Sequence, residues 1–314
     1  MNERRSENQP AIVWFRDDLR LADNPAFHAA AASGRPLICV YVCDEESGGL
    51  RPLGGAAKWW LHGSLAALGD ALRSLGGQLL VLRGAADRVV EALASQADAR
   101  RVYWNRRYDA AGRAVDTRLK SALKGRGIEV ESFKGALLHE PWTAKNKSGE
   151  PFRVFTAFWR AANRLAEPPE PLPIPSGPSF HALPEHVVAA SIDLADLRLQ
   201  PERPDWADGL RAAWGPGESG AWHCLAHFVD KRLHSYADGR DRPDRSSTSR
   251  LSPHLRFGNI SPRQIWHAAG TAEPSRDLDK FLTELGWREF CYHLLYHNPD
   301  LASRNIQPRF DAMP

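Results

Sequence analysis

Hydroxyl and guanidinium side chains are concentrated in one short stretch of the sequence, SSTSRLSPHLRFGNISPRQIW, residues 246–266. Thr248, Ser249 and Ser252 lie close together there, with Arg250 among them. Together with the backbone amides, these groups form a donor-rich loop of the kind that binds phosphate or pyrophosphate. The segment therefore predicts an anion-binding loop, although Ser and Thr clusters also cap helices without binding any ligand.

The surroundings of this loop carry a local positive charge. Eight Lys or Arg and three Asp lie between Lys231 and Arg263, whereas the whole chain has a net charge of only +3. The overall charge therefore gives no argument for polyanion binding, but the local excess suits phosphate groups. Tyr236, at the end of a predicted helix, could close over the same ligand. Ser261-Pro262 is typical of a helix start and needs no ligand to explain it.

A second group of reactive side chains lies in DKFLTELGWREFCYHLLYHNPD, residues 279–300. Helical spacing places a carboxylate, an indole, a guanidinium and a thiol on one face of a helix. An aromatic ring precedes them on the same face. These residues are Phe281, Glu284, Trp287, Arg288 and Cys291. One interpretation is a core helix with a surface Glu284–Arg288 ion pair. The other is a cavity wall that accepts N–H bonds from a nucleobase, stacks on it and contacts phosphate.

The elements before residue 135 must form an α/β domain. Short apolar runs alternate with amphipathic stretches, which is typical of βαβ units and a parallel, doubly wound sheet. The predicted strands are 11–15, 37–42, 78–82, 101–105 and 128–133, and the predicted helices are 24–33, 56–75, 84–96 and 110–126.

Such a sheet binds ligands beyond the carboxyl ends of its strands. Charged residues follow three of the predicted strands: Arg16, Asp17 and Asp18, then Asp44, Glu45 and Glu46, then Arg106 and Arg107. Neither a G-x-G-x-x-G nor a Walker A motif is present in the sequence. A ligand at this edge is expected, but its chemistry stays open.

The second half of the chain is expected to be helical. The segment EPPEPLPIPSGPSF, residues 167–180, contains too many prolines for a helix or a central strand. Helical patterns follow at 221–239, after Ser261-Pro262 and at 277–296, with no strand pattern after residue 205. We therefore predict a Rossmann-like domain at 10–135, an interdomain linker at 136–204 and an incomplete all-helical domain at 205–314.

Composition excludes several other classes of protein. Four scattered cysteines are too few for a disulfide scaffold or a zinc site, so no metal site is predicted. The polar N-terminus MNERRSENQP lacks the apolar region of a secretory signal. No apolar run approaches the ~20 residues of a membrane span. We expect a cytoplasmic, non-membrane protein.

Four segments resemble the photolyase/cryptochrome flavoprotein family, and within it the bacterial class I cyclobutane pyrimidine dimer photolyases most. They are IVWFRDDLRLADNPAF, FKGALLHEPWTAKNKSGEPFRVFTAFWRA, STSRLSPHLRFGNISPR and FLTELGWREFCYHLLYHNPDL, in the family's order. The resemblance implies a Rossmann-like antenna domain of five parallel strands, a long linker and a helical FAD domain.

The resemblance also implies roles for individual residues. The FAD-binding residues would be Tyr236, Thr248, Ser249, Arg250, Leu251, Ser252 and Phe281. Glu284 and Trp287 would face a flipped-out pyrimidine dimer as catalytic residues. The surface that contacts DNA would comprise Arg240, Glu284, Trp287, Arg288 and Cys291. The implied activity is that of a monomeric deoxyribodipyrimidine photo-lyase, which splits dimers in UV-damaged DNA by light-driven electron transfer from reduced FAD.

Two departures from the family pattern leave alternatives open. Family members continue past the point where this sequence stops, so a truncated product, a split gene and a fragment are all compatible with it. We expect residues 1–314 alone to bind FAD weakly or not at all and to lack repair activity. At the antenna position Ala111-Gly112 replaces the Asn-Glu pair of folate-binding relatives. Methenyltetrahydrofolate, a deazaflavin or no second chromophore remain possible. A cryptochrome-like photoreceptor and a non-catalytic antenna-domain fragment are the alternative functions.

Overall fold

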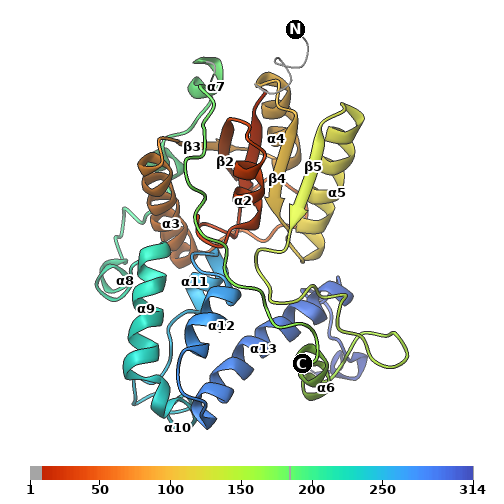
Figure 1. Cartoon of the computed structure of the whole chain (residues 1–314), viewed down its shortest axis with the longest axis vertical. Helices are drawn as coiled ribbons and strands as arrows, with labels where there is room; N and C mark the ends of the chain where they lie inside the picture. Colours follow the sequence, from red (N-terminus) through yellow and green to blue (C-terminus); the bar gives the residue numbers. More distant parts are fainter. Residues whose placement is uncertain (1–8, 184, 314) are drawn as a thin grey trace.

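A five-stranded parallel sheet organises the first part of the chain in the computed structural model, which describes residues 9–183 and 185–313 (Figure 1). The strand order is β3-β2-β1-β4-β5, the doubly wound arrangement that the sequence predicts. Each strand lies within one residue of its predicted bounds. The strands are β1 Ala11–Phe15, β2 Leu37–Cys43, β3 Leu79–Arg83, β4 Arg101–Asn105 and β5 Glu129–Phe133.

Both faces of the sheet are covered because successive side chains of a strand point to opposite faces. In β1, Val13 and Phe15 pack in one core, and Ile12 and Trp14 pack in the other. Helices α2 (Pro25–Ala32) and α3 (Gly55–Ser74) cover the first face. Helices α4 (Ala86–Gln96) and α5 (Ala110–Gly125) cover the second.

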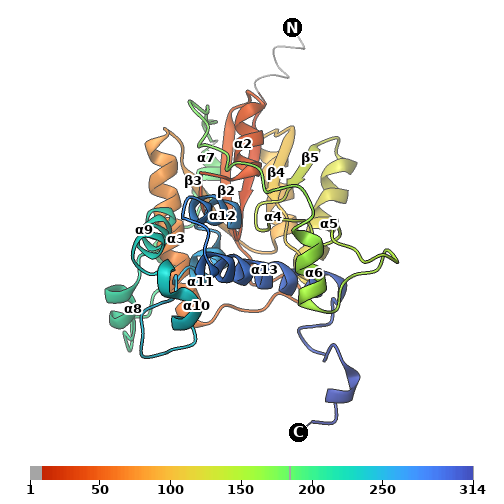
Figure 2. The same ribbon diagram turned by 60° about the horizontal axis from the view of Figure 1, so that its bottom comes forward.

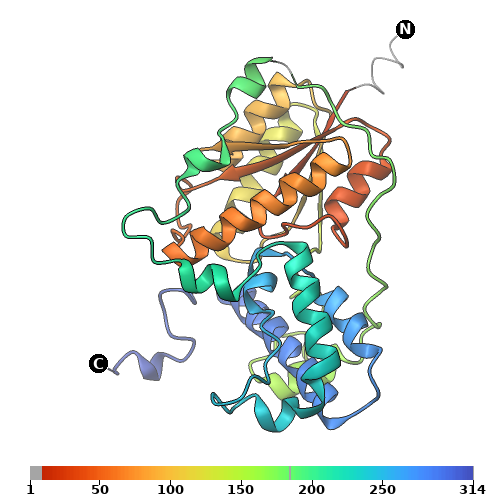
Figure 3. The same ribbon diagram turned by 90° about the vertical axis from the view of Figure 1, so that its left-hand side faces the viewer.

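A helical layer lies below the carboxyl ends of the strands (Figures 1 and 3). Phe228, Leu251, Ile265 and Phe281 are central to its apolar core. The layer comprises α9 (Glu218–Lys231), η2 (Leu233–Ser235), α10 (Tyr236–Gly239), α11 (Ser252–Phe257), α12 (Pro262–Gly270) and α13 (Arg276–His297). The short helix α8 (Asp208–Ala213) packs instead on the core that α3 covers, and the turn η3 (Pro308–Phe310) lies apart from the layer (Figure 3).

The continuous helix predicted at 221–239 is interrupted in the structure. Helix α9 ends at Lys231, and Arg232 leaves helical geometry with φ −125° and ψ −24°. A 3₁₀ turn follows, and α10 then begins at Tyr236, whose ring packs on Phe228 and Phe281 in the helical core. The break is what turns the Tyr236 ring into the core.

The predicted linker contains more structure than its prolines suggested. Helix α6 (Phe155–Ala162) lies beside α13 in Figures 1 and 2, and α7 (Glu185–Ala189) and η1 (Leu194–Leu197) follow later. The Pro-rich part is extended and runs along one side of the molecule (Figure 3). Phe180 forms a parallel bridge with Leu37 at the start of β2, so the linker adds backbone contacts to the sheet.

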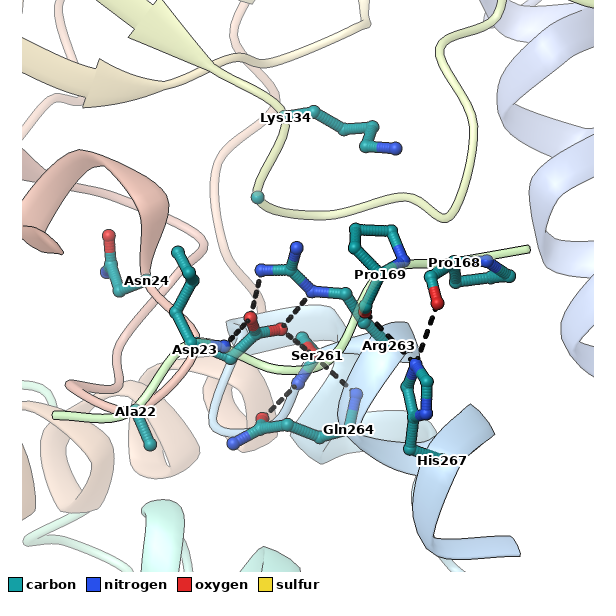
Figure 4. Close-up of polar contacts among 12 residues, drawn as sticks. Ala22, Asp23, Asn24, Lys134, Pro168, Pro169, Ser261, Arg263, Gln264 and His267 are labelled. Atoms are coloured by element: carbon teal, nitrogen blue, oxygen red, sulfur yellow. Dashed lines mark hydrogen bonds and ion pairs between the residues drawn. The ribbon is translucent and has the colours of Figure 1, made fainter. Parts of the chain in front are cut away.

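The sheet, the linker and the helical layer meet at Asp23 (Figure 4). This residue is 1% exposed and adopts a left-handed backbone conformation with φ 51°. Its carboxylate accepts hydrogen bonds from the backbone N–H of Leu172, at 2.9 Å, and from Ser261 and Arg263 at the start of α12. Ser261 also forms a capping box with Gln264. One buried carboxylate therefore contacts all three parts.

None of the helices within residues 9–183 and 185–313 is long and apolar enough to cross a bilayer.

Candidate functional site

The hydroxyl-rich loop and the long helix α13 line one pocket of about 610 Å³ in the helical layer. Its other walls come from α10, α11 and α12. The lining residues are Tyr236, Arg240, Thr248, Ser249, Arg250, Leu251, Ser252, Leu255, Arg256, Ile265, Phe281, Glu284, Leu285, Arg288 and Tyr292. All seven residues that the sequence assigned to FAD are among them. Of the residues assigned to DNA, Arg240, Glu284 and Arg288 line the pocket, whereas Trp287 and Cys291 do not.

The loop at 248–252 is anchored in the helical core by one residue and exposes two hydroxyl side chains to solvent. Leu251 is 2% exposed and packs in the helical core, whereas Thr248 and Ser252 are exposed to solvent. Arg250 adopts a left-handed conformation with φ 59°. Its guanidinium lies 3.9 Å from the centre of the Trp214 ring and donates to the carbonyl of Ala213 at 2.7 Å. The loop therefore presents hydroxyls and a fixed cation to the same space.

The opposite side of the pocket is aromatic. The rings of Phe281 and Tyr236 meet edge to face with their centres 5.4 Å apart, and Phe228 packs behind both. Burial raises the pKa of the Tyr236 hydroxyl, which therefore stays protonated over the physiological range. A ligand that carries both an anion and a flat apolar ring would match this combination of walls.

Glu284 is paired with cations from two directions. Arg240, which follows α10, forms an ion pair with it, and Lys280 lies one turn earlier on α13 with its Nζ 3.2 Å from the carboxylate. Arg288 instead donates to the carbonyl of Ala136 at 2.6 Å. The Glu284–Arg288 pair considered from sequence is therefore wrong. Arg240 takes the position beside Glu284, and the loop after β5 supplies a partner for Arg288.

Trp287 is not among the residues that line the pocket. Its indole stacks on Phe155 of α6, with ring centres 3.8 Å apart and an interplanar angle of 10°, and the residue is 42% exposed. Consecutive residues of an α-helix lie about 100° apart around the axis, so Trp287 and Arg288 fall on opposite edges of the predicted face. Cys291 is an exposed residue. Its thiol is nevertheless partly shielded from water, and this desolvation raises the pKa of the thiol.

A second pocket of about 390 Å³ lies at the carboxyl edge of the sheet. The charged residues predicted there include Arg16, Asp17, Asp44 and Arg107, and all four line it. The carboxylate of Asp17 lies 2.8 Å from Arg107 and 2.7 Å from Arg256 of α11. Burial would raise the pKa of Asp17, but the two guanidinium groups outweigh it and lower this pKa.

Sequence reasoning missed residues that contribute to these pockets. Arg256 and Tyr292 line both of them and so stand between them. Tyr292 could have been predicted from the sequence, because it lies one helical turn after Arg288 and therefore on the same side of α13. Arg256 belongs to the hydroxyl-rich segment, but only the tertiary structure shows its pairing with Asp17. Within the described residues, no group of three or more His, Cys, Asp or Glu side chains is arranged to hold a metal ion.

Comparison with known proteins agrees with this architecture. The model of the DNA photolyase family matches residues 11–176, more than half of the chain. The chain belongs to this family. The deoxyribodipyrimidine photo-lyase of Agrobacterium fabrum is 46% identical over 306 residues, which cover 96% of this chain and 62% of that protein. Cryptochrome-1 of Arabidopsis thaliana is 34% identical over 321 residues, which cover 97% of this chain and 46% of that protein.

The fold of the photolyase family extends over the helical layer. The crystal structure of a bacterial class III photolyase from Agrobacterium tumefaciens superimposes with a TM-score of 0.91 at 45% identity. The match covers 98% of this chain and 63% of that one. That structure is described as class III, not as the class I to which the sequence motifs were likened. The chain spans slightly less than two thirds of the photolyases it matches.

Proposed function

We propose that this chain contributes the flavin-binding and DNA-contacting walls of a light-driven repair enzyme for pyrimidine dimers. The single observation that carries the proposal is the pocket that collects all seven residues matched to FAD, together with Arg240, Glu284 and Arg288. The protein would act as a cytoplasmic monomer on UV-damaged DNA. Reduced FAD, when bound, supplies the electron that splits the cyclobutane ring. A second chromophore, a folate or a deazaflavin, would occupy the pocket at the sheet edge.

The side chains around the pocket fit FAD. The hydroxyls of Thr248, Ser249 and Ser252 would donate hydrogen bonds to the pyrophosphate oxygens, next to the fixed positive charge of Arg250. Tyr236 and Phe281 would pack against the apolar part of the cofactor. Because the anion-binding loop and the aromatic wall belong to one pocket, a nucleotide cofactor with a large ring suits it better than free phosphate does.

Glu284 and Trp287 would hold the damaged bases. The Glu284 carboxylate can accept an N–H bond from a pyrimidine, and the exposed Trp287 indole can stack on a base that has left the helix. Arg240, Arg288 and Cys291 would contact the strand around the lesion. Since phosphate contacts release counterions, binding should weaken as salt is raised.

The alternative function is that of a cryptochrome-like photoreceptor, which the similarity to Cryptochrome-1 favours. The exposed indole of Trp287 favours repair, because a photoreceptor has no need of a stacking surface for a flipped base. The two functions differ in DNA binding. For repair, Trp287→Ala should weaken binding to dimer-containing DNA by ~1–3 kcal/mol and leave undamaged DNA almost unaffected. Equal binding of both DNAs by the unmodified protein would favour the photoreceptor.

Flavin binding gives the direct test of the pocket. FAD is titrated into residues 1–314 and followed by quenching of flavin fluorescence, first in the unmodified chain and then in the Ser249→Ala/Ser252→Ala double variant. We expect weak but saturable binding, because Thr248 and Ser252 are exposed to solvent. The double variant should bind at least about tenfold more weakly, since a hydrogen bond to a charged group contributes ~1.5–3 kcal/mol.

The matched control is Ser74→Ala, which removes an exposed hydroxyl at the end of α3, outside the pocket. It should bind FAD as the unmodified chain does. Equal affinity in the double variant and the control would contradict the assignment of the loop to the pyrophosphate. Under blue light, residues 1–314 alone should show no measurable loss of dimers. Stoichiometric flavin with repair would overturn that expectation.

A further inference from the structure

The aromatic pair Trp287–Phe155 has an unusual geometry. Aromatic pairs in proteins usually meet edge to face or with an offset, with ring centres 4.5–7 Å apart. Here the centres are 3.8 Å apart and the planes differ by 10°, so Phe155 covers one face of the indole. Phe290 meets it at a steep angle of 71° with centres 5.9 Å apart. Because Trp287 nevertheless stays 42% exposed, much of the remaining indole surface is open to solvent.

Phe155 is held in place because residues before it and after it in the sequence both contact α13. After Phe155, the Trp159 indole lies directly on Gly286, where an added Cβ would come within 2.7 Å of the ring. Before it, the backbone N–H of Phe152 donates to Nε2 of His293 at 3.0 Å. The tautomer of His293 is determined by its other nitrogen, Nδ1, which lies 2.8 Å from the carbonyl of Pro141 and must donate to it.

A third contact prevents α6 from rolling over α13. Phe158, which is 3% exposed, packs against Phe290 with ring centres 5.3 Å apart. Phe155 therefore has little freedom to follow a moving indole. An isolated exposed Trp would sample several rotamers and would lose that freedom when a ligand stacked on it. A fixed ring behind the indole removes part of this cost before binding.

We propose that Phe155 is a positioning residue, which holds the Trp287 indole with one face covered and the other ready to receive a single flat base. The inference rests on the proposed function, because it takes the base to belong to a damaged DNA strand. It extends the binding surface from α13 to α6, a helix that the sequence pattern had assigned to the linker. It also predicts that Trp287 stacks with one base at a time.

The first test observes the indole itself. The chain is labelled with 5-fluorotryptophan, and the ¹⁹F resonance of Trp287 is identified by its loss in Trp287→Phe. Phe155→Leu should move this resonance toward that of an unstacked, exposed indole, and Phe155→Tyr should leave it nearly in place. The matched control is Phe152→Leu, because Phe152 packs on the same small cluster but makes no ring contact with Trp287. A Trp287 resonance that moves no further in Phe155→Leu than in Phe152→Leu would overturn the inference.

The second test measures binding to a single-stranded oligonucleotide with one thymine dimer. Phe155→Leu should weaken binding about three- to tenfold, the usual effect of one aromatic pair, and Phe155→Tyr should restore it. In a Trp287→Ala background, Phe155→Leu should cause no further loss. The same loss in both backgrounds would mean that Phe155 acts through folding and would contradict the inference.

The two tests separate this inference from the proposed function. If Trp287→Ala leaves dimer binding unchanged, the role of Trp287 in DNA recognition is wrong, while the ¹⁹F shift still decides whether Phe155 positions the indole. If Trp287→Ala weakens dimer binding and Phe155→Leu behaves like Phe152→Leu in both tests, the positioning role is wrong and the proposed function stands.

Discussion

Glu284 shows how the surroundings of one side chain determine its chemistry. On α13 alone it would be an ordinary surface carboxylate, with Lys280 one turn away. In the folded chain it lines the pocket beside Phe281 and forms an ion pair with Arg240, which directly follows α10. The ion pair therefore orients the carboxylate at the boundary between the proposed flavin and DNA surfaces. A carboxylate in this position can accept hydrogen bonds from base N–H groups.

Glu284→Gln should lower the preference of the protein for dimer-containing DNA. The amide accepts a weaker hydrogen bond than a carboxylate, so the ratio of the two affinities should fall by about tenfold. Binding to undamaged DNA should rise slightly, because the substitution removes one negative charge and releases Arg240 toward phosphate. Both affinities are measured at two salt concentrations. The control is Glu150→Gln, an exposed acid outside the pocket. An unchanged ratio in Glu284→Gln would exclude Glu284 from dimer recognition.

Helices α6 and α13 pack closely because one position of α13 has no side chain. Gly286 lies in the interior of α13, where glycine normally destabilises a helix by ~1 kcal/mol relative to alanine. The indole of Trp159 occupies the space that a Cβ would need. Gly286 therefore lowers the helix propensity of α13 but allows α6 to pack closely on the helix that carries Glu284 and Trp287.

Gly286→Ala should destabilise the protein by ~1–2 kcal/mol, because the overlap with a rigid ring outweighs the gain in helix propensity. The matched control is Gly69→Ala in the interior of α3, where an added Cβ would meet only Arg73 Nη2 at 3.8 Å. That substitution should stabilise the protein by ~0.5–1 kcal/mol. Urea unfolding of both variants gives the comparison. A stabilising effect of the same size at both positions would show that Trp159 moves without cost.

At the scale of the whole molecule, Glu289 connects the sheet domain to the helical layer. This residue is 3% exposed, and its carboxylate accepts hydrogen bonds from the backbone N–H groups of Leu138 and His139, in the loop that follows β5. Burial raises its pKa to about 7, although Arg288, these two N–H groups and Lys134 act in the opposite direction. The contact between the two parts of the molecule therefore includes a carboxyl that titrates near neutral pH.

The stability of the protein should depend on this group between pH ~4.5 and ~7. In that window the folded state keeps the proton of Glu289 while the unfolded state has released it, so stability falls as the pH rises. Glu289→Gln removes this dependence. Relative to the unmodified protein, the variant should gain up to about 3 kcal/mol between pH 4.5 and pH 8. Urea unfolding at both pH values measures this gain. A constant difference between the two proteins would show that Glu289 does not titrate in this range.

Local patterns in the sequence determined the elements of the sheet domain and most residues that line the candidate site. The strands of the sheet were predicted to within one residue because buried parallel strands are short apolar runs between turn signals. The loop at 248–252 and the predicted face of α13 were visible because hydroxyl, aromatic and charged residues cluster at close spacing. Their assignment to FAD and DNA came from the resemblance to the photolyase family.

Contacts between distant segments were decided only by the tertiary structure. Arg240 pairs with Glu284, Arg256 with Asp17, Phe155 with Trp287, and Asp23 with Arg263. Each pair joins residues far apart in the chain. The spacing of residues within one segment does not predict which other segment that segment will contact. The predicted linker, 136–204, included residues 155–162, whose apolar residues form α6 against α13. Which side of α13 faces the pocket, and what stacks behind its indole, followed from that packing.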